Sequence, residues 1–517
     1  MCAQLKQGGV VVGLKKEGNK EQIYYIGDDS HLLCIGATRS GKSRCLVIQS
    51  ICTLGLAGES IVISDAKSEL FDYTAPFLEK LGYEVLTLDF KNPSKSQRYN
   101  LLQPIIDAVN LGDTDKAEML AWDLTNALVG KAEGEKIWTN GESSTIAAAI
   151  LCVVCDNKRR PDYQNLTNVY WFLAEMCKSI GNKMPLIEYV KKLPATHSAK
   201  ALLAIADVAP SRTRGSFYTS ALTTLRLFTS KSIYAITNQS DFLLQDIGRK
   251  KQALFIILPD EKTTFYPVAS LIISQQYELL ANLADTRGGR LEQRVNFLLD
   301  EFGNFTAISD FTNKLTVGGG RGMRFNLFLQ SFTQLVEKYN EQVSSIIKAN
   351  CHVWAYLRSE DPDTLREISD KLGSYTTSSY QLSVNHAKYT TPSSSHSLSL
   401  IERKLLTPDE VKRVARPYQI VTSATYPAMM YSPDLNEWYF NKMLGLGDKE
   451  FNRKLREERE AKRPIVTDVT VDISLWNIWV YYQKDIIRQM QAKNSNTGMG
   501  EADNITMGEM PPGGDMD

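Results

Sequence analysis

The sequence contains no long apolar run of the kind that crosses a membrane. Its longest apolar stretch, residues 146–155, is about half of the roughly 20 residues that a membrane-spanning helix needs. Residues 1–20 lack the apolar core that precedes the cleavage site of a signal peptide. We therefore expect a cytoplasmic chain that is soluble as given, unless a membrane anchor has been removed or is supplied by a partner.

An excess of charge and a cysteine framework are also missing. The 59 Lys and Arg residues equal the 59 Asp and Glu residues, so any contact with nucleic acid must come from local patches such as a narrow channel. The eight cysteines have no regular spacing, which is typical of a reducing compartment. Cys152 and Cys155 form a C-x-x-C inside the apolar run, and we interpret them as core residues. The five histidines lack metal-ligand spacing, and no G-x-S-x-G sequence offers a nucleophilic serine.

The chain is long enough for two or three domains, since it has 517 residues. An opening hairpin (10–14 and 23–26) precedes alternating strands and helices, which predicts a mainly parallel sheet with helices on both faces. Strands are expected at 31–35, 60–64, 83–88, 253–258, 295–299, 325–329 and 352–357, and helices at 42–56, 69–81 and 267–283. Between about residues 105 and 246, helical patterns dominate and strand-like runs are missing, which predicts an all-α domain inserted in the α/β domain.

The pattern divides the chain into five expected parts. They are an α/β nucleotide-binding domain in two pieces (1–105 and 247–446), an all-α domain (106–246), C-terminal helices (447–493) and a disordered acidic tail (494–517). A Ser- and Thr-rich excursion is expected at 374–399, and an amphipathic helix with an aromatic stripe at 475–491. The charges of the tail are all acidic: Glu501, Asp503, Glu509, Asp515 and Asp517.

One glycine-rich segment matches G-x-x-x-x-G-K-S and lies between an expected strand and an expected helix. Its glycines let backbone N–H groups curl around the β- and γ-phosphates of a nucleotide, and the N-terminal end of the helix favours the same anion. Lys42 supplies a positive charge there, and Ser43 offers a hydroxyl to magnesium. We predict a nucleotide site formed by Gly36, Ala37, Thr38, Arg39, Ser40, Gly41, Lys42, Ser43 and Arg44. The alternative is a glycine-rich turn without a ligand.

Two acidic residues follow the expected strand at 295–299. In a parallel sheet the carboxyl ends of the strands meet at the ligand edge. Asp300 is predicted to hold magnesium together with Ser43, directly or through water, and Glu301 to polarise the attacking water as general base. A strand that ends in acids is common, so this prediction depends on the phosphate loop. The next strand delivers Gln330 to the same edge, where it could sense the γ-phosphate or orient water; a polar strand end without a role is the alternative.

The glycine-rich segment 318–322 offers an arginine on a flexible backbone. Arg321, with Arg324 behind it, is a candidate for reaching a phosphate across a subunit interface, which would couple hydrolysis to a ring. The alternative is a solvated or DNA-facing arginine. At the end of the second strand, Asp65 and Lys67 could support magnesium or communicate between subunits, while capping of the next helix by Asp65 or Ser68 is equally compatible with the sequence.

In combination these segments resemble the type IV secretion coupling proteins, the conjugative DNA-transfer ATPases of the TraG/TraD kind. The resemblance runs in order over about residues 8–443. The matching segments are the phosphate loop, Asp65-x-Lys67-x-Glu69, Tyr99-Asn100-Leu101-Leu102, Trp138, the acidic motif at 298–304, Gly320-Arg321-Gly322, Leu329-Gln330-Ser331, Asn350, Leu372-Gly373 and 406–411. Two departures are the lack of the transmembrane helices with which such proteins usually begin, and Ala66 and Ser68 in place of the usual Pro and Gly.

The resemblance implies an α/β fold with a RecA-like P-loop domain plus an inserted all-α domain. It implies ATP and Mg²⁺ as cofactors, with Lys42, Glu301, Arg321 and Gln330 as catalytic residues. It implies a homo-hexamer, possible as a monomer in isolation, at the cytoplasmic face of the cell membrane. The implied partners are a relaxase, DNA-processing accessory proteins, DNA and components of the secretion channel.

Two other functions stay open on the sequence. One is a DNA-pumping translocase of the same RecA-like class, which would need a DNA-reading module. The other is a docking receptor for secretion substrates that uses nucleotide only to assemble. The sequence identifies neither the cargo nor the role of the acidic tail.

Overall fold

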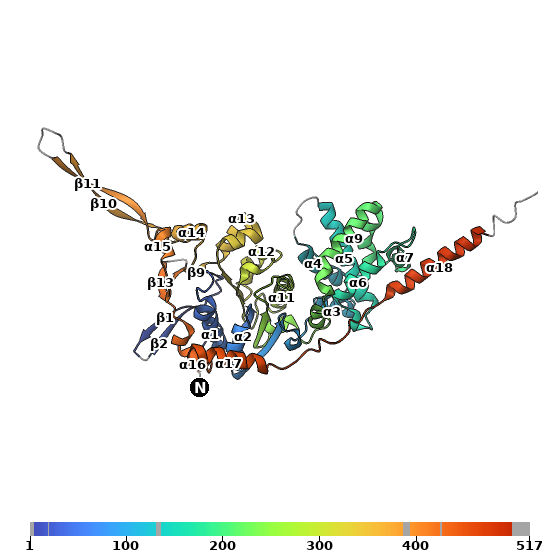
Figure 1. Ribbon diagram of the computed structural model, residues 1–517, viewed down its shortest axis with the longest axis horizontal. Coiled ribbons are helices and arrows are strands. Elements are labelled where there is room, and N and C mark those ends of the chain that lie inside the picture. The colour runs from blue at the N-terminus through green and yellow to red at the C-terminus, as the bar shows by residue number, and fades with distance from the viewer. Residues whose placement is uncertain (1–4, 19, 131–135, 386–392, 424–425, 499–517) are drawn as a thin grey trace, which may run out of the picture. The chain divides into compact units, whose positions relative to one another are not determined.

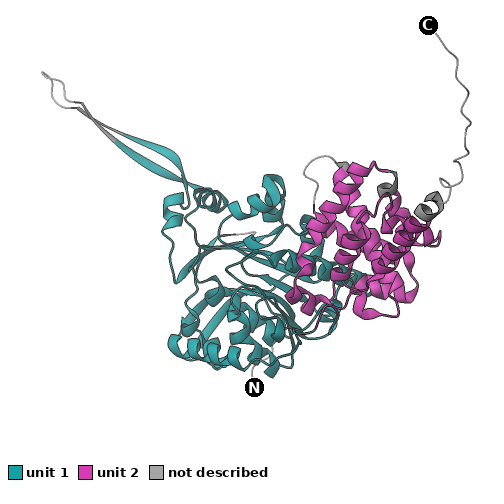
Figure 2. Cartoon of the chain, turned by 45° about the vertical axis from the view of Figure 1, so that its right-hand side comes forward, with its two compact units in different colours: residues 1–99, 240–471 teal, residues 100–239, 472–517 magenta. Residues whose placement is uncertain are grey.

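The computed structural model describes residues 5–18, 20–130, 136–385, 393–423 and 426–498. The chain forms two compact units (Figure 2): unit 1 comprises residues 1–99 and 240–471, and unit 2 comprises residues 100–239 and 472–517. The segment expected as one group of C-terminal helices (447–493) is divided between them. Its first helix, α17 (Lys449–Lys462), belongs to unit 1, and its second, α18 (Ile478–Gly498), to unit 2.

Unit 1 is built on a nine-stranded sheet, counted over the described residues, in the order β13-β12-β9-β3-β8-β7-β4-β6-β5. Its strands are β3 (Leu32–Gly36), β4 (Ser60–Asp65), β5 (Glu84–Asp89), β6 (Gln252–Ile257), β7 (Val295–Leu299), β8 (Met323–Leu329), β9 (Val353–Arg358), β12 (Tyr418–Thr422) and β13 (Ala428–Tyr431). Pairing is parallel from β9 through β5, and β12 pairs antiparallel with both β9 and β13, so that among the described strands of this sheet β12 alone is reversed. The predicted mainly parallel α/β sheet is confirmed.

The strands form because their sequences are apolar on both faces. Every residue of β7 and β8 is buried, as expected of central parallel strands that helices cover on both sides. The helices of unit 1 (Figure 1) are α1 (Ile48–Ala57), α2 (Glu69–Lys80), α11 (Tyr266–Thr286), α12 (Phe311–Gly318), α13 (Thr333–Asn350), α14 (Pro362–Leu372), α15 (Pro408–Lys412), α16 (Tyr439–Met443) and α17. The helix expected at 42–56 opens with a π-helical turn, Ser43–Val47, before α1.

Two hairpins extend this sheet domain. β1 (Val10–Glu17) pairs with β2 (Lys20–Ile26), as the sequence predicts. β10 (Ser374–Asn385) and β11 (Ser393–Lys404) pair antiparallel along their whole length. Figure 1 shows this second hairpin as a long arm that projects from the end of unit 1 next to α14 and α15. The Ser- and Thr-rich excursion expected at 374–399 is therefore an extended β-arm.

The named elements of unit 2 are all helices over the described residues, which confirms the predicted all-α addition to the α/β fold. Its helices are α3 (Gln103–Leu111), α4 (Thr114–Val129), α5 (Lys136–Asp156), α6 (Leu166–Met176), α7 (Pro185–Lys192), α8 (Ser198–Val208), α9 (Ser211–Leu225), α10 (Lys231–Thr237) and α18. The apolar run of α5 is buried among its neighbours. Cys152 is fully buried there and Cys155 is half-buried, and burial raises the pKa of both thiols, which supports core packing for the C-x-x-C.

The last helix differs from the expected span 475–491. It begins at Ile478 and continues to Gly498, so the first residues assigned to the tail are helical. Asn, Ser and Thr have low helix propensity, but adding residues to a helix that is already nucleated and packed costs little. The aromatic stripe anchors this region: Trp476 stacks on Phe172 with ring centroids 5.6 Å apart, and Tyr482 meets Tyr189 edge-to-face at 5.6 Å. The remainder of the tail, 499–517, lies outside the described residues.

Across the described ranges, none of the helices combines the length and the apolar character needed to span a bilayer.

Candidate nucleotide site

The phosphate loop connects β3 to the helical turn at Ser43–Val47, and its two glycines have no substitute. A Cβ at Gly36 would overlap the Ser40 hydroxyl and the Lys42 side chain. Gly41 has a φ of 94°, which side chains rarely adopt, and a Cβ there would overlap the guanidinium of Arg416. The chain therefore turns back on itself here only because both positions lack a side chain.

Two polar groups of this loop are buried. The Lys42 ammonium is 5% exposed and reaches the Leu329 carbonyl at 3.4 Å. The Ser40 hydroxyl is buried and has no hydrogen-bond partner among the described residues. A buried hydroxyl without a partner is costly in a finished fold. A phosphate group in the loop would satisfy it, and the residues present therefore fit a bound anion.

The structure places the two predicted acids that follow β7 beside Lys42 and Ser43 of this loop. Because β3, β8 and β7 are parallel neighbours, their carboxyl ends share one edge of the sheet. The Ser43 hydroxyl donates to the Asp300 carboxylate at 2.8 Å. The Lys42 ammonium lies 3.4 Å from the Glu301 carboxylate.

Gln330 completes the cluster from the end of β8. Its amide N–H donates to Glu301 at 2.9 Å, and its amide oxygen accepts from the Thr38 hydroxyl at 3.2 Å. The side chain thus joins the phosphate loop to the carboxylate that was predicted as general base. Glu301 itself has a φ of 51°, a left-handed conformation that is uncommon outside glycine and that concentrates at functional sites.

Asp300 and Asp65 carry buried carboxylates beside one another in the sheet. Burial raises the pKa of Asp300, while the charge of Lys42 and the hydrogen bond from Ser43 act in the opposite direction. Burial raises the pKa of Asp65 to about 7, although its carboxylate accepts from the backbone N–H groups of Phe71 and Lys67 at 2.8 and 3.1 Å. Of the two interpretations of Asp65, capping of the first turn of α2 is therefore confirmed.

Arg44 and Lys67 point their charges at acids rather than at the loop. The Arg44 guanidinium makes a two-pronged contact with Asp434 at 2.8 and 2.9 Å, which raises its pKa. Lys67 is mostly exposed and lies 4.0 Å from Asp260. The side chain of Arg44 thus links the start of the helix to the C-terminal part of unit 1.

Arg321 and Arg324 have different environments. Arg321 precedes β8 and so lies at the edge of the sheet opposite the phosphate loop, where it donates to the Ala281 carbonyl at 2.9 Å and to Asp285 at 3.0 Å. Arg324 is 1% exposed and pairs with Glu59 at 2.6 Å. Burial lowers the pKa of Arg324 to about 10. The expectation that Arg324 could reach across an interface is wrong, because its charge is sealed inside the sheet.

Other motif residues stabilise the backbone. Thr407 and Glu410 form a reciprocal capping box that opens α15. Gly373 ends α14 with a φ of 81°. Trp138 on α5 meets Phe217 edge-to-face at 5.9 Å. These motif residues therefore have structural roles in helix capping and side-chain packing.

Arg416 is a loop contact that sequence reasoning missed. Its guanidinium donates to the Ser40 carbonyl at 2.5 Å and to the Arg39 carbonyl at 2.9 Å. It follows α15, far along the chain, and no local motif marks it. The one trace in the sequence is Gly41, whose missing side chain makes room for this guanidinium.

The fold and the site together define a RecA-like P-loop protein with an added helical unit. Comparison with known families then gives the particular group: the family described as "Type IV secretory system Conjugative DNA transfer" matches residues 3–458. The chain belongs to this family.

Two curated relatives are similar in sequence to this chain. The chain is 24% identical over 409 residues to Protein VirD4 of Rhizobium rhizogenes, covering 78% of this chain and 58% of that protein. It is 26% identical over 432 residues to Conjugal transfer protein TraG of Escherichia coli, covering 79% of this chain and 66% of that protein. The chain thus spans less than two thirds of the length of either relative.

Solved structures of the bacterial conjugative coupling protein TrwB have the same fold. The unbound monoclinic form of TrwBdeltaN70 superposes with a TM-score of 0.59 at 16% identity, covering 80% of this chain and 86% of that one. TrwB in complex with the non-hydrolysable ATP analogue ADPNP gives a TM-score of 0.58 at 16% identity, covering 79% and 86%. At this identity the likeness is one of fold.

We expect Asp300→Asn to raise the melting temperature of the protein without added nucleotide or metal. Burial raises the pKa of Asp300, so the folded chain holds this proton more tightly than the unfolded chain, and ionisation costs stability as the pH rises through the folded-state pKa. Asparagine removes the charge; its amide oxygen can still accept from the Glu301 N–H, and its amide N–H can donate to the Ser43 oxygen, so that this second hydrogen bond reverses direction. The gain should grow as the pH rises above about 4, the ordinary pKa of an aspartate, and vanish well below that pH, where both states are protonated.

Thermal unfolding across that pH range, with and without magnesium and an ATP analogue, measures this effect. The ligands should stabilise the parent protein and not the variant. An Asp300→Asn protein that is less stable at every pH without ligand would contradict the assignment of Asp300 as a buried charge awaiting a cation.

Arg416→Ala should weaken nucleotide binding about tenfold, which corresponds to about 1.4 kcal/mol. The substitution removes the two hydrogen bonds that hold the carbonyls of Ser40 and Arg39, and these bonds keep the loop in shape before the phosphates arrive. Isothermal titration with a non-hydrolysable ATP analogue measures the affinity. The control is Arg413→Ala, which changes an exposed arginine directly after α15. Equal affinities for the two variants would contradict the role of Arg416 in shaping the loop.

Proposed function

We propose that this chain is an ATP-driven coupling protein that recruits a relaxase–DNA substrate and delivers it to a type IV secretion channel during conjugative transfer. The observation that carries the proposal is the cluster of Lys42, Ser43, Asp300, Glu301 and Gln330 around the phosphate loop. Family membership supports the transfer role.

In the proposed reaction, Glu301 accepts a proton from water as the water oxygen attacks the γ-phosphorus and the bond to the ADP oxygen breaks. Lys42 stabilises negative charge on the phosphate oxygens. Gln330 holds the carboxylate through its amide N–H. Phosphate oxygens compete with Glu301 for the Lys42 ammonium, 3.4 Å away, so nucleotide binding itself frees the base.

Ser43 and Asp300 are the residues that would hold magnesium. A hydroxyl and a carboxylate oxygen are ligands that this ion accepts, and a cation there would relieve the buried charge of Asp300. When bound, the ion supplies neutralisation of phosphate charge. The donor set of the chain therefore fits the cofactor that the proposal needs.

Arg321 is proposed to act in a homo-hexameric ring rather than in its own subunit. Its position at the sheet edge opposite the phosphate loop leaves it available to a neighbour's site, as a head-to-tail ring requires. The partners of such a ring would be a relaxase, DNA-processing accessory proteins, DNA and the channel components at the cytoplasmic face of the membrane. The names "Conjugal transfer protein TraG" and "Bacterial conjugative coupling protein TrwBdeltaN70" support the conjugative part of this assignment.

Two alternatives predict different behaviour. A DNA-pumping translocase would use ATP in proportion to DNA length and would not require a relaxase. A nucleotide-assembled docking receptor would transfer substrate without turnover. The proposal therefore depends on linking hydrolysis to relaxase-dependent transfer.

Glu301→Gln should lower kcat for ATP at least about 100-fold without weakening nucleotide binding, because it removes a general base and keeps the hydrogen bond to Gln330. Lys42→Ala should weaken binding as well as turnover. Both variants should abolish conjugative transfer in cells, measured beside purified ATPase activity. Glu292→Gln, an exposed acid on the same unit, is the control. Normal transfer by both site variants would favour the docking receptor.

Arg321→Ala should be inactive alone yet recover turnover when mixed with Glu301→Gln protein. In a mixed ring, the variant that lacks Arg321 still has its own base and receives the arginine of a neighbour. ATPase activity as a function of mixing ratio measures this complementation, with Arg287→Ala as the control for an exposed arginine. A mixture as inactive as its components, in a ring verified by mass, would contradict action in trans.

A further inference from the structure

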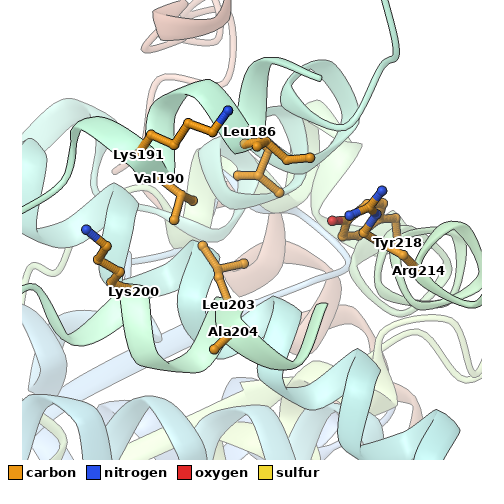
Figure 3. Close-up of a pocket in the computed structure, with 9 residues that line it drawn as sticks. Leu186, Val190, Lys191, Lys200, Leu203, Ala204, Arg214 and Tyr218 are labelled. Carbon is orange, nitrogen blue, oxygen red and sulfur yellow. The ribbon is translucent and has the colours of Figure 1, made fainter. Parts of the chain in front are cut away.

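A cavity of about 410 Å³ lies among α7, α8 and α9 of the helical unit (Figure 3). Leu186, Ile187, Val190, Leu203 and Ala204 supply its apolar lining. This volume is within the range of pockets that bind a few side chains of a ligand. The cavity is therefore large enough to receive part of a peptide.

The polar lining of this cavity is cationic. Lys191, Lys200 and Arg214 line it together with Tyr218, and no acid is among the described residues that line it. Figure 3 shows Lys191 and Lys200 on one side, and Arg214 with Tyr218 on the other, with Leu203 between them.

Neutralisation of these three charges is incomplete. Lys200 donates to the Leu193 carbonyl at 3.1 Å, and no carboxylate of the described residues forms an ion pair with it. Lys191 meets Glu188 at 3.1 Å but stays 66% exposed. Among the described residues no carboxylate forms an ion pair with Arg214. The cavity thus suits a ligand that carries apolar side chains flanked by acids.

We propose that the occupant is the chain's own C-terminal segment, residues 499–517. That segment has five acids and no Lys or Arg, and its larger apolar residues are mainly methionines, which adapt to irregular pockets. The apolar residues are Met499, Ile505, Met507, Met510 and Met516. Charge complementarity and apolar content therefore both match the cavity.

The root of the segment is held beside the same cavity. On α7, Lys192 follows Lys191 directly; it pairs with Asp485 of α18 at 3.5 Å and lies 4.8 Å from the ring centre of Tyr482. From Asp485 to the end of α18 at Gly498 the helix spans about 20 Å. The segment that follows can reach about 60 Å when extended, so it can return to α7 with many residues to spare.

Such docking is intramolecular and salt-dependent. Tethering gives an effective concentration in the millimolar range, so a weak contact suffices to fill the cavity. The contacts are between partly exposed charges, which salt screens. While the tail occupies the cavity, any other acidic and apolar segment must displace it.

Hydrogen exchange and glutamyl-endopeptidase cleavage of the full chain test this proposal. Reversing the pocket with Lys200→Glu and Arg214→Glu should speed cleavage after Glu501 and Glu509, and exchange of the tail, by about fivefold or more, because the tethered closed state is lost. Raising the salt should do the same in the parent protein. Arg159→Glu with Arg212→Glu, two exposed arginines of the same unit that do not line the cavity, makes the same charge change and should have no effect.

A second pair of variants separates docking from loss of folding. Reversing Glu501, Asp503 and Glu509 to Lys changes no residue of the packed helices, and should free the tail and raise exchange in α7 and α9. Combined with the pocket reversal, the tail reversal should restore protection. A parent tail that exchanges as fast as a free peptide of residues 499–517 would overturn the proposal. Protection that disappears on dilution would also overturn it, since the tail would then occupy a second copy.

Discussion

The hydrogen bond between Ser43 and Asp300 joins the two halves of the nucleotide site, and it depends on the strand order of the sheet in unit 1. One partner comes from the first part of the chain and the other from the part that follows the helical unit. They meet at 2.8 Å because β3, β8 and β7 are parallel neighbours whose ends share an edge. The helical residues between Asn100 and Gln239 leave the sheet and return to it without disturbing this register.

The same junction concentrates electrostatic cost. Lys42, Asp300 and Asp65 are all nearly buried, and burying charges that lack water requires compensation by partners. Lys42 and Ser43 supply part of it to Asp300, and backbone N–H groups supply it to Asp65. The unpartnered Ser40 hydroxyl marks where compensation is incomplete. A phosphate with its cation would complete the set.

The elements that could be predicted from the sequence are those marked by a local pattern of apolar and polar residues. Strands such as 295–299 are recognisable because both faces are apolar, and the acids after them because parallel strands end together. Arg416 has no such signal: it contacts Ser40 only after the β-arm and α15 bring it back to the loop. The sequence alone does not distinguish Arg324 from Arg321, three positions earlier, and only the pairing of Arg324 with Glu59 across the sheet places its side chain inside. Contacts between distant segments are not encoded in local spacing.

The balance of 59 basic and 59 acidic residues excludes steering by bulk charge, so recognition must depend on where charges are segregated. The chain segregates them twice. The phosphate loop confines a lysine among buried acids, and the helical unit lines an apolar cavity with three cations while the C-terminal segment carries only acids. A neutral protein with separated opposite charges tends to pair them with each other when a tether permits it. If the tethered tail fills the cavity as proposed, any other acidic segment must exceed the affinity of the tail to enter it.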